Sequence, residues 1–66
     1  MNVDTLVMMA NQIARNVPVR GEEAAIAATA AHIREFWEPR MIGALRAAEP
    51  DALSAVARAA LARLER

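Results

Sequence analysis

Cysteine, lysine and tyrosine are absent from this 66-residue chain, which has only two glycines, one phenylalanine and one tryptophan. Without cysteine, the chain can form neither a disulfide nor a thiolate-ligated metal site. Its single histidine, His32, has no second histidine with which to share a metal ion, and its carboxylates are scattered. Gly21 and Gly43 do not make a glycine-rich phosphate loop. The sequence therefore predicts no metal site and no cofactor site in this chain.

The hydroxyl side chains do not form a recognisable catalytic group. Ser54 lies far along the chain from His32, and no G-x-S-x-G turn surrounds it. Cysteine and lysine, two other common nucleophiles, are missing. We therefore expect that the chain is not an enzyme by itself. His32 is interpreted as a histidine at the border of an apolar face or as a contact to a partner, since a ligand or proton-transfer role lacks co-ligands.

Small size and an alanine-rich composition point to dependence on another chain. A chain of this length buries only about 60% of the surface that it exposes when unfolded. Hydrophobic residues make up 56% of the sequence, but many are alanines, which bury little area. Small domains usually add a disulfide, a metal or a partner to reach stability. Because the first two are excluded, we expect association with another protein.

The charge balance bears on which partners are suitable. Eight arginines balance eight acidic residues, so the net charge is zero, and a neutral chain attracts nucleic acid or an anionic membrane only weakly. We expect neither partner, although a DNA-binding domain that reads DNA through residues 39–48, with Arg40 and Arg46, is an alternative. The longest apolar stretch, residues 24–31, is too short to span a bilayer. With no signal-peptide pattern at its start, the protein is expected to be cytoplasmic.

The spacing of apolar residues predicts an all-α fold in a single domain, and no stretch alternates as a strand would. Residues recur at i, i+3, i+4 and i+7, as on one face of a helix. The predicted helices cover residues 3–16, 22–37, 39–48 and 51–65, which makes a small bundle of three main helices plus one short helix after Pro39. Asn2 or Asp4 can cap the first helix. Pro18, Pro39 and Pro50 separate the helices, because proline ends a helix or begins the next.

Residues 32–41 concentrate the large, rigid side chains, including the only Phe and the only Trp. Phe36 and Trp37 are interpreted either as core residues or as anchors for a partner, since aromatic residues and arginine are favoured at binding hot spots. Pro39 gives this corner a rigid shape. Arg40 stands at a helix start, against the helix dipole, and is expected to meet a carboxylate or phosphate within the fold or outside it.

The polar side of the first helix gives a second candidate contact. Met8 falls among polar residues there, and is interpreted as an ordinary exposed residue or as part of a docking surface. Asn11 and Gln12 are either solvated or hydrogen-bonded to the backbone of a partner.

Two blocks of this sequence resemble a known family. Leu6-Val7-Met8-Met9-Ala10-Asn11-Gln12-Ile13-Ala14, followed by His32-Ile33-Arg34-Glu35-Phe36-Trp37-Glu38-Pro39-Arg40-Met41, is similar to the small delta subunit of soluble, NAD-dependent, molybdenum-containing formate dehydrogenase. The family pattern is Met-Ala-Asn-Gln-Ile, then His-Ile-Arg-x-Phe-Trp-x-Pro-Arg-Met. The chain departs from it at Asn16-Val17-Pro18, where an aromatic residue is expected, and at Ile42, where a basic one is expected.

The resemblance implies a non-catalytic subunit that helps assemble or stabilise the large catalytic subunit. It also implies that molybdopterin, iron–sulfur clusters, FMN and NAD belong to other subunits. On this interpretation the main contact consists of Phe36, Trp37, Pro39, Arg40 and Met41, with a second contact at Met8, Asn11 and Gln12. The alternative is a helical module with no enzyme partner, which self-associates as a homodimer through its alanine face and its closing leucine stripe.

Overall fold

The computed structural model of this chain describes residues 2–64. The elements in order are α1 (Val3–Asn16), α2 (Glu22–Phe36), α3 (Pro39–Arg46), the short 3-10 helix η1 (Pro50–Ala52) and α4 (Ala55–Arg63). No strand occurs among the described residues, so the all-α prediction is confirmed. Within this part of the chain, no helix has the length and apolarity needed to cross a membrane.

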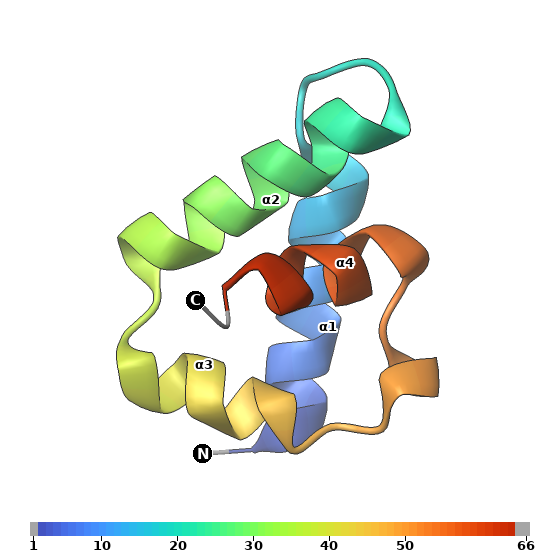
Figure 1. Cartoon of the computed structure of the whole chain (residues 1–66). Helices are drawn as coiled ribbons and strands as arrows, with labels where there is room; N and C mark the ends of the chain where they lie inside the picture. Colours follow the sequence, from blue (N-terminus) through green and yellow to red (C-terminus); the bar gives the residue numbers. More distant parts are fainter. Residues whose placement is uncertain (1, 65–66) are drawn as a thin grey trace.

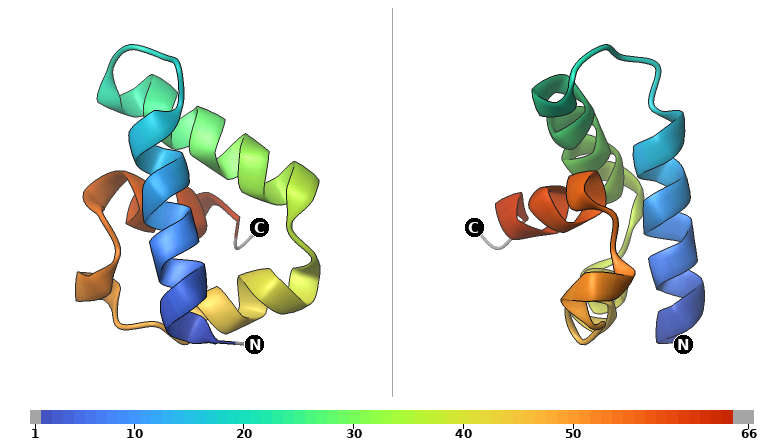
Figure 2. Two further views of the ribbon diagram at one scale, coloured as in Figure 1. Left: turned by 180° about the vertical axis from the view of Figure 1, so that it is seen from behind. Right: turned by 90° about the vertical axis from the view of Figure 1, so that its right-hand side faces the viewer.

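The helices form two layers. α2, α4 and α3 lie one above another on the same side of α1 (Figures 1 and 2). α4 packs mainly against α2, although α3 is closer to it in the sequence. The closing helix therefore holds α2 in place, and the end of α2 shares a core cluster with α1.

The first three helices begin where the sequence predicts. Asn2 caps α1, because its Oδ1 accepts hydrogen bonds from the backbone N–H groups of Asp4 (2.8 Å) and Thr5 (3.4 Å). Gly21 precedes α2 with a φ of 89°, a backbone conformation that residues other than glycine rarely adopt. α3 begins at Pro39 and ends at Arg46, two residues before the predicted end.

The predicted helix over residues 51–65 is wrong at its start. η1 covers only Pro50–Ala52, Leu53 is extended (φ −91°, ψ 141°), and α4 begins at Ala55. The reason is a capping serine: Ser54 Oγ accepts a hydrogen bond from the Ala57 N–H (3.2 Å), which fixes the first turn. Residue 65 lies outside the described residues.

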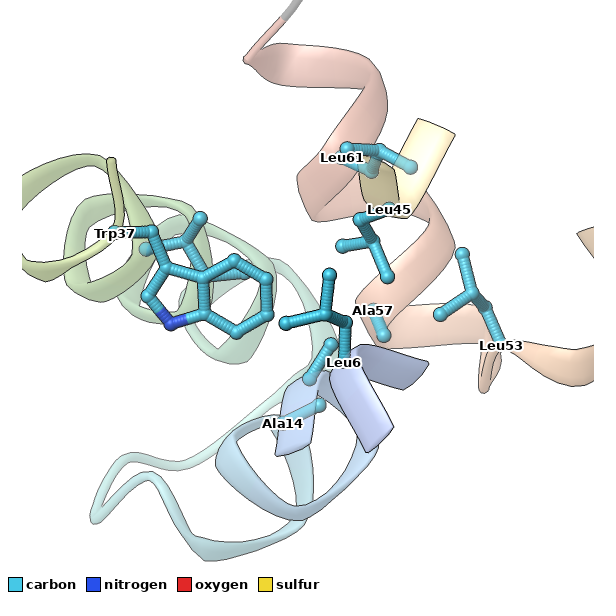
Figure 3. Close-up of a cluster of buried hydrophobic side chains, with 9 residues drawn as sticks. Leu6, Ala14, Trp37, Leu45, Leu53, Ala57 and Leu61 are labelled. Carbon is cyan, nitrogen blue, oxygen red and sulfur yellow. The ribbon is translucent and has the colours of Figure 1, made fainter. Parts of the chain in front are cut away.

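The main core forms where α1, α3 and α4 meet the end of α2. Its buried members are Leu6, Ala10, Ala14, Ile33, Trp37, Leu45, Leu53, Ala57 and Leu61. Figure 3 shows Trp37 with its six-membered ring directed toward Leu6. A smaller cluster of Ile26, Ala30 and Ala60 joins α2 to α4. Trp37 is the largest of these side chains, so it fixes how the α2–α3 corner sits against α1.

Candidate functional site

A groove of about 680 Å³ opens where the C-terminal half of α1 meets the end of α2 and the start of α3. We call it the α1–α2 groove. Figure 2 (left) views the molecule with α1 in front and the α2–α3 connection beside it. The lining residues are Met9, Gln12, Ile13, Asn16, Val17, Pro18, His32, Phe36, Trp37 and Met41. They come from five parts of the chain: α1, the loop after it, α2, the α2–α3 connection and α3.

Two consecutive aromatic residues take opposite roles at this groove. α2 ends at Phe36, and Trp37 is extended (φ −96°, ψ 141°), which turns the indole into the core, where it is 7% exposed. Phe36 is still helical and remains 67% exposed. The Trp37 side chain thus forms the floor of the groove, and the Phe36 ring stands at its edge.

His32 lies one helical turn before Phe36 and supports its ring. The two ring centroids are 4.8 Å apart, with the planes tilted by 45°. Such aromatic pairs are worth about 0.5–1.5 kcal/mol beyond the area that they bury. The pair orients a large apolar side chain that the fold itself leaves in water. An exposed, oriented aromatic ring beside a groove is typical of a surface that binds another molecule.

The polar side chains of the groove are the amides of Gln12 and Asn16 and the imidazole of His32. Gln12 and Asn16 are both exposed, and neither side chain forms a hydrogen bond with another residue in the 2–64 range. No aspartate, glutamate or arginine lines the groove. Its surface is therefore mainly apolar, with one imidazole and with two amides that can each donate and accept hydrogen bonds.

The structure brings together residues from both predicted contacts. Phe36, Trp37 and Met41, from the predicted main contact, share this groove with Gln12, from the predicted second contact. Pro39 and Arg40 do not line the groove but are exposed at the start of α3, next to it in the sequence. Over the described part of the chain, no carboxylate pairs with the Arg40 guanidinium. The anionic partner expected for it therefore stays a prediction.

Asn11 has a different position from Gln12. Its Nδ2 donates a hydrogen bond to the Ala52 carbonyl (3.0 Å), and its Oδ1 accepts one from the Ser54 N–H (2.9 Å). Both polar atoms of this amide are thus engaged within the chain, where they hold the segment before α4 against α1. Asn11 does bond to backbone, as one interpretation of the sequence requires, but to the backbone of its own chain. A partner contact at Asn11 stays a prediction, as does one at Met8, which is 62% exposed and outside the groove.

Sequence reasoning missed several members of the groove. Met9, Ile13, Asn16, Val17 and Pro18 were not among the predicted contacts, and His32 was a partner contact in only one of its two interpretations. Asn16 carried a usable signal, because it follows Gln12 by four residues and so shares its face of the helix. The loop residues carried none, since their position depends on how α1 and α2 meet. In the part of the chain that the structure describes, no group of three or more histidines and carboxylates could hold a metal ion.

Comparison with protein families identifies the chain. The family described as "NADH-dependant formate dehydrogenase delta subunit FdsD" matches residues 5–61. This range includes every residue of the α1–α2 groove and at least part of every helix. Comparisons with curated proteins and with solved structures give no match. Because the family match covers most of the 66 residues, the chain belongs to the family of formate dehydrogenase delta subunits.

Proposed function

We propose that this chain is a non-catalytic accessory subunit that binds the large, molybdenum-containing catalytic subunit of formate dehydrogenase and stabilises it or helps it mature. Family membership supports a place in the formate dehydrogenase complex. The observation that carries the binding role is the exposed Phe36 at the edge of the α1–α2 groove. In this proposal, molybdopterin, iron–sulfur clusters, FMN and NAD are held by other subunits.

Burial of Phe36 would supply the main driving force. Taking a fully exposed Phe side chain out of water is worth about 1.5–3 kcal/mol. The ring is 67% exposed in this chain, so most of that gain is available to a partner. Residues of this type at the centre of an interface cost about 2 kcal/mol or more when truncated.

Trp37 and Arg40 would support the contact in different ways. Trp37 is a core residue, so it acts by holding the α2–α3 corner and the groove in place. Arg40 is exposed beside the groove and can pair with a carboxylate of the partner at the rim. A rim ion pair affects the association rate and its salt dependence more than the affinity.

The self-associating alternative loses one of its two surfaces. It requires the closing leucine stripe to be exposed, but Leu53 and Leu61 are 4% and 8% exposed and belong to the core. The alanine face remains, because Ala24, Ala27 and Ala31 are exposed on α2. Alanines alone offer little apolar area for a stable dimer.

Co-purification tests the proposed function. An affinity tag on this chain in its native host should recover the large molybdenum-containing polypeptide in a fixed ratio, as identified by mass spectrometry and native mass. Recovery of the chain alone, as a monomer or as a homodimer, would contradict the proposal.

A further inference from the structure

We propose that the α1–α2 groove binds an extended, uncharged segment of the partner, whose backbone hydrogen-bonds to Gln12 and Asn16 while one apolar side chain packs against Phe36. This inference rests on the proposed function, because it assumes that the groove is where the partner docks. It goes further by specifying the conformation and the charge of the bound segment.

The spacing of the two amides matches an extended backbone. Gln12 and Asn16 are four residues apart on α1, which corresponds to a rise of about 6 Å along the helix. In an extended chain, residues i and i+2 face the same side and are about 6.6 Å apart. One amide can therefore meet residue i of the segment, and the other can meet residue i+2.

The hydrogen-bonding capacity of these amides also favours a segment in that conformation. A carboxamide both donates and accepts, as does each peptide unit. An extended segment has peptide groups free to pair, whereas the backbone of a helix is already bonded within itself. The side-chain amides of Gln12 and Asn16 lack a hydrogen-bond partner among residues 2–64 and are thus free to bind. Asn11, on the neighbouring position, shows the same chemistry inside the chain, because its amide binds the extended backbone around Leu53.

Charge complementarity indicates an uncharged segment. Neither an acidic side chain nor an arginine lines the groove. The one ionisable side chain in the lining is His32, whose ring packs against Phe36 at the edge of the groove. A charged side chain inserted between Met9, Ile13 and Met41 would lose water without meeting an opposite charge, which is costly. The apolar lining of Met9, Ile13, Phe36 and Met41 instead suits an aliphatic or aromatic side chain.

A second copy of this chain is a poorer occupant. A stable interface needs about 800 Å² from each partner, nearly a fifth of the 4391 Å² surface of this small chain. Of the large hydrophobic residues that are exposed, Met9 and Phe36 line the groove, but Met8 and Val19 do not. No broad apolar face therefore surrounds the groove, and two grooves placed face to face would leave a hollow between them.

The test uses the formate dehydrogenase complex assembled with variants of this chain. Gln12→Ala and Asn16→Ala each remove one amide, and Arg15→Ala is the matched control, because Arg15 is exposed on α1 outside the groove. Each variant competes with labelled wild-type chain for the complex. We expect about a fivefold loss of affinity for each amide, the effect of one hydrogen bond, and no change for Arg15→Ala.

Hydrogen–deuterium exchange of the same complexes then distinguishes the conformations. With Gln12→Ala, the amides of an extended segment should exchange about fivefold faster, because they depend on this chain for protection and lose one hydrogen bond. A docked helix would stay slow, since its bonds are internal, and that result would overturn the inference. So would unchanged affinity for both amide variants, or a complex containing two copies of this chain joined through their grooves. If Phe36→Ala still weakens binding in those cases, the proposed function stands and only the extended segment is refuted. If the wild-type chain binds no large subunit, both fail.

Discussion

The Asn11 amide should be a major source of stability in this small fold. Asn11→Ala removes two hydrogen bonds, to the Ala52 carbonyl (3.0 Å) and from the Ser54 N–H (2.9 Å). Each is worth about 1 kcal/mol net. Alanine recovers about 0.5 kcal/mol because it is a better helix former than asparagine. The free energy of unfolding should therefore fall by about 1.5 kcal/mol.

Thermal and urea unfolding of the full chain, followed by far-UV circular dichroism, would measure this loss. A fall of that size corresponds to a Tm lower by about 6–12 °C in a domain of this length. Gln12→Ala is the matched control, because Gln12 is the next residue, is exposed, and has no hydrogen bond among the described residues. It should change the unfolding free energy by less than about 0.5 kcal/mol. Equal effects of the two substitutions would refute the role assigned to the Asn11 amide.

Three further predictions concern the stability contributed by Trp37, Thr29 and Ser54. Trp37→Ala removes the largest buried side chain of the core and should cost about 3–5 kcal/mol, so the helical dichroism of the isolated chain should be largely lost at 25 °C; retention of a wild-type Tm would show that the indole is not structural. Thr29→Val should raise the free energy of unfolding by about 1 kcal/mol, and with it the urea midpoint, because Thr29 Oγ1 is buried without a hydrogen-bond partner in residues 2–64; a lower midpoint would contradict this. Ser54→Ala removes the α4 cap and should cost about 1 kcal/mol in the same assay, and an unchanged midpoint would argue that α4 starts elsewhere.

Sequence patterns were enough for most of the helices. The apolar spacing located α1, and Pro39 located the start of α3, because both signals depend on neighbouring residues alone. The start of α4 was missed because Leu53 continues the apolar stripe of that helix. Its side chain is buried as the stripe requires, but its backbone is extended. Leu53 is thus buried at a position that fits helical spacing, although its backbone is not helical.

The candidate site was only partly accessible from the sequence. Asn11 and Gln12 are adjacent and similar in chemistry, so no local pattern separates them. What separates them is a contact across more than forty residues, between Asn11 and the segment before α4. Phe36 and Trp37 present the same problem: the residue at which α2 ends decides which ring enters the core. The family resemblance, confirmed by the match to residues 5–61, supplied the biological setting that these patterns do not contain.

We propose that the catalytic subunit binds the side of this chain that carries Phe36. The most direct measurement is the affinity of Phe36→Ala for the large formate dehydrogenase subunit, compared with that of Met8→Ala. Both residues are large, apolar and more than 60% exposed, but only Phe36 lines the α1–α2 groove. We predict a loss of about thirtyfold for Phe36→Ala, which corresponds to about 2 kcal/mol, and a smaller loss for Met8→Ala, because Met8 belongs to the predicted second contact outside the groove. Wild-type affinity for Phe36→Ala, in a variant whose circular dichroism shows a normal fold, would contradict the account.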